Sequence, residues 1–393
     1  MQSPIYLDNN STTPIDPRVM EVMLPYFITR FGNPSNTLHS YGVEAADAVE
    51  QARDQVAATV GASRREIVFT SGATESDNLA ILGTCRFNKP QYDHVVTVVT
   101  EHKAVLETCR HVEQEGFRVT YLPVDHYGMI SLEELESAIT PTTLLVSVMA
   151  ANNEIGTIAP MKAIGAICHN RGVLFHSDAV QAIGRIPVNV DEWGVDLLSI
   201  SAHKLYGPKG VGALYIRQTG AKFGVAPLTF GGGQEQGLRS GTLPVPQIVG
   251  LGAACGISQE RQLEEAECIG ALRTALKERL LAAVPGAVVH GHPEQSLPGL
   301  LNIGFPDAEG DVFIQLLTGV AASQGSSCSA GSFEPSHVLR AIGVSDDLAR
   351  SSLRLGVGRF TTVDEIEKAA ELIIAALQRA RQATVPTAVR SQT

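Results

Sequence analysis

Two residues with reactive side chains stand together where an apolar run ends. In the segment VDLLSISAHKLYGPKG (195–210), the run VDLLSI is soon followed by His203 and Lys204, and then by a loop with two glycines and a proline. Lysine is among the residues least often buried. A lysine just after the carboxyl end of a buried strand is therefore either an ordinary loop residue or an amine held there for a reaction. Burial favours the neutral amine that a Schiff-base lysine requires.

A second candidate is FTSGATES (69–76), in which a short strand runs into a glycine turn and then a helix. The start of a helix offers unpaired backbone N–H groups and the positive end of the helix dipole, which suits an anion. Thr74 could add a hydroxyl. The segment lacks the lysine pattern of a nucleotide-binding P-loop, and a plain serine–glycine helix cap explains the same residues.

Two further polar side chains follow apolar strands. Asp178 comes just after a strand in FHSDAVQAIG (175–184), with Gln181 three residues later. Its carboxylate could cap a helix or hold a cationic ring nitrogen. His102 lies just past the end of the strand VVTVVT (95–100). It is either a hydrogen-bonded structural histidine or a ring that lies flat on an aromatic ligand.

Taken together, these residues fit one cofactor. Pyridoxal phosphate has a phosphate, a protonatable ring nitrogen and an aldehyde, and it needs an anion cradle, an acid and a lysine. Thr74, Asp178 and Lys204 supply these three groups. The combination predicts a pyridoxal-phosphate enzyme in which Lys204 forms the Schiff base.

The elements that must position these residues alternate between strands and helices. Near-continuous apolar strands between helices indicate a mostly parallel sheet covered on both faces, and sites in such sheets gather at the carboxyl ends of strands. The expected strands are 66–70, 94–100, 117–124, 143–150, 172–179, 195–201 and 211–217. The expected helices are 42–62, 71–85, 101–116, 131–139 and 161–172.

The pattern changes after about residue 250. A long amphipathic stretch (247–284) is expected to connect to a smaller α+β domain that ends in a helix capped by Thr362 and Glu365. We predict a large domain over 1–250, whose N-terminal arm (1–20) packs on the small domain. The connecting helix and small domain take 251–382, and 383–393 is expected to be a flexible tail.

Composition excludes several classes of protein. The net charge of −11, with a pI near 5.5, argues against nucleic acid as a partner. No apolar run reaches the roughly 20 residues that span a bilayer, and the N-terminus lacks the pattern of a signal peptide. We therefore expect a cytoplasmic protein with no membrane partner.

The six cysteines are widely spaced, without a C-x-x-C pair or zinc spacing. Five are interpreted as structural thiols. Cys328 differs because it lies in SQGSSCSAGS (323–332), a polar segment rich in glycine and serine, where a thiol is expected to be exposed and able to move.

The chain resembles the cysteine desulfurases of the NifS/IscS type, within the class V aminotransferases. The resemblance covers nearly the whole chain, and the order and spacing of its motifs make it specific. It implies a fold type I transferase of the pyridoxal-phosphate class, an α/β protein with a mostly parallel seven-stranded sheet and a smaller α+β domain. The motifs are YLDNNSTTP (6–14), FGNPSN (31–36), SGATESDN (71–78), EHKAVLETCR (101–110), NNEIGTIAP (152–160), HSDAVQAIG (176–184), SAHKLYGPKG (201–210), RSGTLPVP (239–246), GSSCSAGSFEPSHVLRAIG (325–343) and LRLGVGRFT (353–361).

The resemblance implies a role for each matching residue. Lys204 matches the cofactor-binding lysine, and His102 the histidine stacked on the pyridine ring. Asp178 matches the acid at the ring nitrogen, and Gln181 the amide near the ring hydroxyl. The other implied cofactor-binding residues are Ala73, Thr74, Asn153, Ser201 and His203, together with Thr242, which reaches the site from the second subunit of a homodimer.

The implied substrate is L-cysteine, whose carboxylate Asn153 and Arg354 would hold. Lys204 would remove the α-proton, Cys328 would take the sulfur as a persulfide, and L-alanine would leave. The sulfur would pass to an acceptor or iron–sulfur scaffold protein, for cluster assembly or other sulfur biosynthesis. No metal ligand is expected with certainty, although Cys328 could transiently ligate an iron–sulfur cluster together with a scaffold partner.

Other functions stay open on the residues alone. A different pyridoxal-phosphate enzyme, such as an aminotransferase or a kynureninase-like hydrolase, would not need Cys328. An inactive sulfur-transfer scaffold would not need Lys204. A cofactor-free α/β interaction protein would not be yellow. Two departures from many relatives, Ala202 for glycine and Ser327 for alanine, are small.

Overall fold

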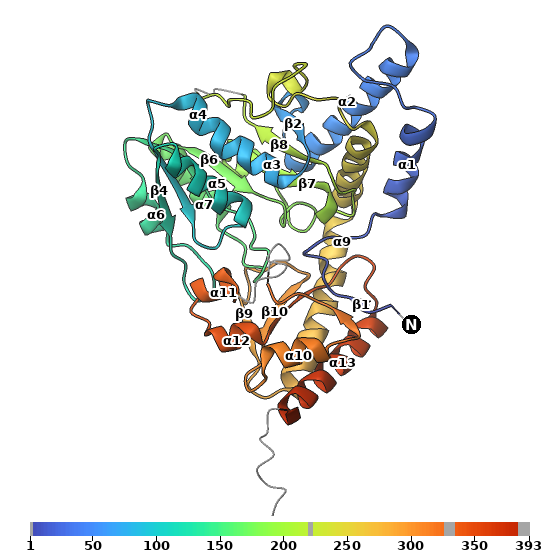
Figure 1. The fold of residues 1–393 in the computed structure, drawn as a ribbon, viewed down its shortest axis with the longest axis vertical. Helices are drawn as coiled ribbons and strands as arrows, with labels where there is room; N and C mark the ends of the chain where they lie inside the picture. Colours follow the sequence, from blue (N-terminus) through green and yellow to red (C-terminus); the bar gives the residue numbers. More distant parts are fainter. Residues whose placement is uncertain (1–2, 219–222, 326–334, 384–393) are drawn as a thin grey trace, which may run out of the picture.

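The computed structural model describes residues 3–218, 223–325 and 335–383. Its upper part in Figure 1 is built on a seven-stranded sheet in the order β2-β8-β7-β6-β5-β3-β4. Strand β8 runs antiparallel to β2 and β7, and the other neighbours are parallel, which confirms the mostly parallel sheet. The strands are β2 (Ile67–Thr70), β3 (His94–Val98), β4 (Arg118–Leu122), β5 (Thr143–Ser147), β6 (Leu174–Asp178), β7 (Leu197–Ser201) and β8 (Gly212–Ile216).

Helices cover both faces of this sheet because successive strand residues point to opposite sides. Val68 and Val95 enter a core with α5, whereas Phe69 and Val96 enter the core on the other face. The predicted helix over 71–85 is α3 (Ala73–Asn78), a π-helical turn (Leu79–Gly83) and α4 (Thr84–Asn88). The remaining helices here are α2 (Ser40–Val60), α5 (Lys103–Gln114), α6 (Leu132–Ala138), α7 (Met161–Arg171) and α8 (Val190–Trp193).

The long helix α9 (Val245–Ala283) joins the two parts of the molecule (Figure 1). Its first half contributes Ile248 and Leu251 to the core of the large sheet. Its second half contributes Leu276 and Leu280 to a separate core below. A helix of 39 residues is about 58 Å long, which lets one element belong to both cores.

The lower part is a three-stranded antiparallel sheet, in the order β12-β10-β9, with helices against it. Its final helix begins with the expected capping box, because Thr362 and Glu365 each accept a hydrogen bond from the other's backbone N–H. The elements are β9 (Val288–His290), β10 (Leu300–Gly304), α10 (Gly310–Leu316), α11 (His337–Ala341), α12 (Asp346–Arg350), β12 (Ser352–Gly356) and α13 (Val363–Ala383).

The N-terminal arm crosses between the two parts. Strand β1 (Ile5–Tyr6) pairs in parallel with β11 (Val320–Ala321), and Asn9 donates to the carbonyl oxygen of Gly356 over 2.8 Å. Helix α1 (Pro17–Ile28) follows and packs on α9. Neither short strand was predicted, because two residues carry no alternation of apolar and polar side chains.

The domain boundaries stay predictions, and α9 runs across the one at residue 250. Residues 384–393 of the predicted tail lie outside the described residues. No helix in the described part of the chain is both long and apolar enough to cross a membrane.

Candidate active site

The carboxyl ends of β6 and β7 bring the central candidate residues to one edge of the sheet. Asp178 ends β6 and Ser201 ends β7, and these strands are hydrogen-bonded neighbours. Lys204 closes the 3₁₀ turn (Ala202–Lys204) that follows β7. His102 follows β3 and Asn153 follows β5, in the same sheet. Parallel strands align their ends, so residues far apart in sequence meet here.

The amine of Lys204 is held by the N-terminal arm. Its Nζ donates to the carbonyl oxygens of Asn10 and Ser11, each over 2.5 Å. Burial, together with the cations Arg185 and Arg354, lowers the pKa of this amine to about 7. A substantial neutral fraction at neutral pH is what a Schiff-base lysine or general base requires.

His203 supports the same turn through its backbone and ring. Its carbonyl oxygen accepts from the N–H and Oγ1 of Thr13, over 2.9 and 3.0 Å, and its Nδ1 lies 3.1 Å from the Oγ1 of Thr12. Burial, with Lys204 and Lys209 nearby, lowers the pKa of the imidazole to about 4. The ring is therefore neutral at physiological pH.

Asp178 is 6% exposed and accepts a hydrogen bond from the N–H of Val180 over 3.0 Å. Burial raises the pKa of its carboxyl, while His102 and Lys204 act in the opposite direction. A buried carboxylate is stabilised by a cation. A protonated pyridine nitrogen would be such a cation, so the acid fits the predicted cofactor.

His102 is the N-cap of α5, and its Nδ1 accepts a hydrogen bond from the N–H of Ala104 over 3.1 Å. This bond fixes the orientation of a half-buried ring. Both interpretations of His102, as a cap and as a ring that lies on a ligand, are compatible with this geometry.

Gln181 is fixed on both sides of its amide. Its Nε2 donates to the carbonyl oxygen of Asn10 over 2.9 Å, and its Oε1 accepts from Asn10 Nδ2 over 3.0 Å. The Nη1 of Arg185 also donates to this oxygen, over 2.5 Å. One Nε2–H remains for a further acceptor, which suits a ring hydroxyl.

Arg354, on β12, joins the small sheet to the site and is 1% exposed. Its Nη1 donates to the carbonyl oxygen of Asn153 over 3.1 Å. Its Nη2 donates to Asp8 Oδ1 over 2.9 Å and to Ser11 Oγ over 3.0 Å. The guanidinium therefore already holds one carboxylate, which is the chemistry needed for the carboxylate of an amino acid.

The predicted phosphate cradle lies at the start of α3. Ala73 and Thr74 are its first residues and Thr74 is exposed. The preceding Gly72 has φ 151° and faces Gly212 of β8 so closely that a Cβ on Gly212 would lie 2.7 Å from the Cα of Gly72. Glycines therefore permit this close turn.

Thr242 is exposed in the loop before α9. The nearby Arg239 donates to Glu75 Oε1 over 3.0 Å, which attaches this loop to α3. Cys328 lies outside the described residues. The described residues on either side are anchored at the site. Ser323 pairs with the backbone of Arg354, and Ser336 donates to Glu154 Oε2 over 2.5 Å.

Four of the other cysteines are poor nucleophiles in this structure. Cys85, Cys109, Cys168 and Cys255 are buried, and burial raises the pKa of each thiol. Cys268, expected to be a packed structural residue, is instead exposed on α9. Within the described residues no cluster of histidine, cysteine and acidic side chains could hold a metal ion.

Sequence reasoning gave no role to the arm residues Asp8, Asn10 and Ser11, which contact Arg354, Gln181 and Lys204. The signal available was the polar cluster DNNST directly after an apolar residue at the start of the chain. Such a cluster has no local strand or helix to belong to.

The sequence of this chain is similar to those of known proteins along nearly its whole length. The family model described as Aminotransferase class-V matches residues 5–369. A cysteine desulfurase of Mus musculus is 52% identical over 379 residues, which are 96% of this chain and 82% of that protein. The cysteine desulfurase IscS of Rickettsia typhi is also 52% identical over 379 residues, 96% of this chain and 92% of that protein.

Solved structures agree with these matches. A NifS-like protein superposes with a TM-score of 0.89 at 40% identity, covering 96% of this chain and all of that one. A structure described as SspA in complex with cysteine superposes with a TM-score of 0.80 at 38% identity, covering 91% of this chain and 99% of that one.

Proposed function

The chain belongs to the class-V aminotransferase family and is a pyridoxal-phosphate-dependent cysteine desulfurase of fold type I, and from this premise we propose which of its residues carry the reaction. The observation that carries the proposal is the amine of Lys204, whose pKa is about 7 at the carboxyl edge of the sheet. The same edge holds Asp178, and Arg354 reaches it from the small sheet.

The residues present fit the cofactor. Lys204 would bind it covalently, Asp178 would lie at its ring nitrogen, and Gln181 would donate its remaining Nε2–H to the ring hydroxyl. His102 would lie against the ring. Its phosphate would be held by the N–H groups of Ala73 and Thr74, the hydroxyls of Thr74 and Ser201, and the neutral ring of His203, with Thr242 of a second subunit. Pyridoxal phosphate, when bound, withdraws electrons from the Cα of the amino acid.

The chain's own residues bind the substrate, move its proton and accept its sulfur. Arg354 and Asn153 hold the carboxylate of L-cysteine, and Arg354 exchanges its contact with Asp8 for the substrate. The neutral amine of Lys204 takes the proton from Cα. The thiolate of Cys328 attacks the substrate sulfur, the C–S bond breaks, and the products are L-alanine and a persulfide on Cys328.

Two kinds of protein partner belong to this proposal. The persulfide sulfur passes to an acceptor or iron–sulfur scaffold protein, with which Cys328 could transiently ligate a cluster. The active form is a homodimer. The cytoplasmic location expected from the sequence stays a prediction.

The reaction is tested with purified enzyme, pyridoxal phosphate, L-cysteine and a reductant. We expect equal amounts of alanine and sulfide, because each persulfide is reduced once for each alanine released. Omitting the reductant should slow release sharply after about one turnover per site, since a single thiol accepts the sulfur and only the thiol of the substrate is then left to reduce the persulfide. Amino-group transfer that requires a keto acid and yields no sulfide would instead indicate an aminotransferase.

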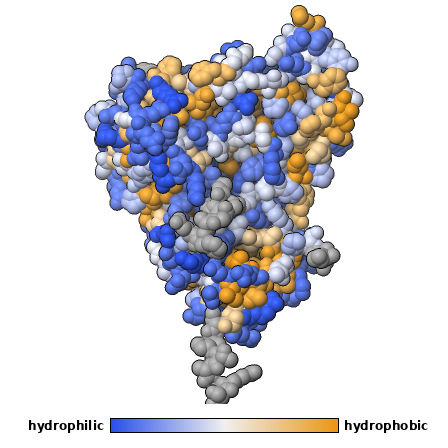
Figure 2. All heavy atoms as spheres, viewed as in Figure 1, coloured by the Kyte–Doolittle hydropathy of each residue, from blue (hydrophilic) through white to orange (hydrophobic). Residues whose placement is uncertain are grey.

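Exposed apolar side chains support the homodimer. Figure 2 shows them gathered at the upper right, where α1 and the loop after it lie. Phe27 is 52% exposed, Ile28 63%, Phe31 67% and Leu38 94%. A large exposed apolar patch typically marks a protein interface, and two-fold symmetry is the commonest closure.

The dimer predicts complementation between two inactive variants. Lys204→Ala removes the amine, and Thr242→Asp places a negative charge against the phosphate of the neighbouring site. If Thr242 acts across the interface, a hybrid of the two variants has one intact site and one doubly defective site. An equal mixture of refolded subunits should recover about a quarter of wild-type activity, since half of the dimers are hybrids with one working site.

Each variant refolded alone is the control, and each should stay inactive. Hybrids that form but remain inactive would show that Thr242 serves its own subunit. Sedimentation of the wild-type enzyme as an active monomer would refute the dimer itself.

A further inference from the structure

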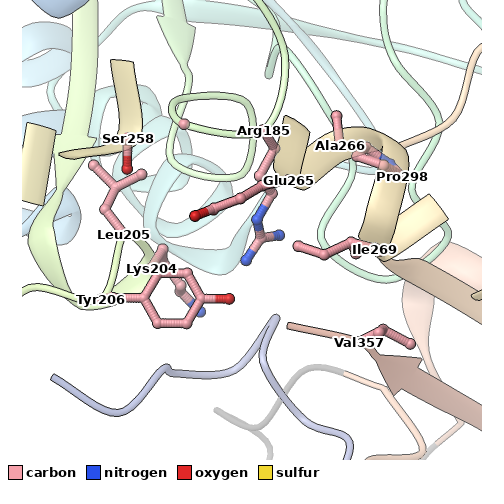
Figure 3. A pocket seen from close by; sticks show the side chains of 12 residues that line it. Arg185, Lys204, Leu205, Tyr206, Ser258, Glu265, Ala266, Ile269, Pro298 and Val357 are labelled. Carbon is pink, nitrogen blue, oxygen red and sulfur yellow. The ribbon is translucent and has the colours of Figure 1, made fainter. Parts of the chain in front are cut away.

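A cavity lies directly behind Lys204. Figure 3 shows it lined by Lys204 and Tyr206 after β7, by Arg185 from the loop after β6, and by Glu265 of α9. The empty space is about 430 Å³, including part that is open to solvent. The guanidinium of Arg185 and the carboxylate of Glu265 both point into it (Figure 3). The cavity therefore brings a second cation close to the reactive lysine.

Arg185 has neutral hydrogen-bond acceptors. Its Nη1 donates to Gln181 Oε1 over 2.5 Å and its Nη2 to the carbonyl oxygen of Asn9 over 3.1 Å. Glu265, the acid in the cavity, is paired with Arg359, whose Nε lies 2.8 Å from Oε1. Among the residues that the structure describes, no carboxylate oxygen lies within 4.0 Å of the Arg185 guanidinium. Its charge is not neutralised by direct contact.

A short chain of hydrogen bonds leads from Arg185 to Lys204. The Oε1 of Gln181 accepts a hydrogen bond from Arg185, and its Nε2 donates one to the carbonyl oxygen of Asn10. The same carbonyl oxygen accepts from Lys204 Nζ over 2.5 Å. A guanidinium can only donate, so Gln181 must turn its oxygen to Arg185 and its nitrogen toward the arm and the site.

We propose that Arg185 is a positioning residue of this enzyme: its positive charge, next to Lys204 across the cavity, favours the neutral form of the ε-amine, and its guanidinium orients the amide of Gln181. The other cation near the amine, Arg354, is different because Asp8 lies 2.9 Å from its Nη2. Of these two cations, Arg185 is thus the one that acts on Lys204 without a contacting carboxylate among the described residues.

The direction of the Lys204 pKa agrees with this geometry. Burial lowers it most, Arg185 comes next and Arg354 third, while Asp178 and Asp8 raise it. His203 beside it is neutral at pH 7, because burial lowers the pKa of its ring to about 4. The pKa of the Tyr206 phenol is raised by burial, so Tyr206 adds no negative charge. Glu265, the remaining charged group at the cavity, is paired with Arg359.

The test measures the amine of Lys204 directly in the cofactor-free enzyme. Trace acetylation with acetic anhydride at a series of pH values, followed by peptide mass mapping, gives the pH at which half of the amine is neutral. We expect this midpoint near pH 7 in the wild type. Arg185→Met should raise it by about one unit, so that labelling at pH 7 falls several-fold, since one pKa unit changes the ratio of neutral to charged amine tenfold.

Three further variants make the result decisive. Arg185→Lys keeps the charge and loses the fork, so its midpoint should stay near the wild-type value. Arg185→Gln removes the charge and keeps a polar side chain, so it should match Arg185→Met and serves if the methionine variant does not fold. Arg171→Gln, at an exposed ion pair with Glu136, should leave the midpoint unchanged.

Charge-removing variants that fold and keep the wild-type midpoint would overturn the proposal. The proposal would also be overturned if Arg185→Lys shifted the midpoint as far as Arg185→Met does. The hydrogen bonds of the guanidinium, and not its charge, would then determine the pKa of the Lys204 amine. The meaning of this inference for catalysis rests on the proposed role of Lys204. The labelling needs neither cofactor nor turnover, so its outcome is separate from any failure of the desulfurase reaction.

Discussion

Replacing Lys204 with alanine is expected to lower alanine release from L-cysteine by at least about 10²- to 10⁴-fold, the range that a single general base contributes. The variant loses both the base and the amine to which the cofactor attaches. Alanine is measured by amino-acid analysis at saturating cofactor. Lys209→Ala is the matched control, because Lys209 is an exposed lysine five residues further along the chain.

The same pair of variants locates the cofactor. Borohydride reduction of wild-type enzyme, followed by peptide mapping, should place the pyridoxal adduct on Lys204, and Lys209→Ala should retain it there. An adduct on another lysine, in wild-type protein that carries the cofactor, would show that the assignment is wrong.

Replacing Cys328 with serine is expected to reduce alanine release to background while cofactor binding is retained. Serine is barely ionised near neutral pH, whereas an unperturbed thiol is already a few per cent thiolate. The change in the absorption spectrum of the bound cofactor on adding L-cysteine should therefore persist without turnover. Cys268→Ser, at the exposed cysteine of α9, is the matched control and should keep full activity.

This second experiment separates the two chemistries that the fold can support. An aminotransferase with an incidental cysteine at position 328 would lose nothing on substitution by serine. Wild-type alanine release from L-cysteine by that variant would falsify the desulfurase mechanism, however well the cofactor assignment held.

The sequence predicted the sheet, and the strand ends at which the candidate residues meet, because both depend on local patterns. β-branched strands, glycine helix ends and capping residues are read over a few positions, and the carboxyl ends of parallel strands then meet at one edge. Asp178, Ser201 and Lys204 could thus be placed near one another before any coordinates were known.

What could not be predicted depends on pairings between distant segments. The arm's strand has two residues and finds its partner at Val320. The electrostatic field at Lys204 depends on Arg354 contacting a carboxylate and on Arg185 contacting none in the part of the chain that the structure describes, which no spacing in the sequence reveals. The proposed role of Thr242 requires a second copy of the chain, and the exposure of Cys268 depends on how α9 packs.

The arm also fixes when, during protein synthesis, an active site can exist. Asp8 contacts Arg354 across 346 residues of sequence, which at about 5–20 residues per second take roughly 20 to 70 s to translate. For most of that interval the first strand has no partner, because β11 (Val320–Ala321) has yet to be made. A ribosome-bound chain can therefore complete the large sheet, with Lys204 at its edge, before it contains Arg354, the arginine proposed to hold the substrate carboxylate. Chains released early by premature termination would contain Lys204 but lack Arg354. Whether the N-terminal arm becomes part of an active site therefore depends on the synthesis of β11 and β12 near the other end of the chain.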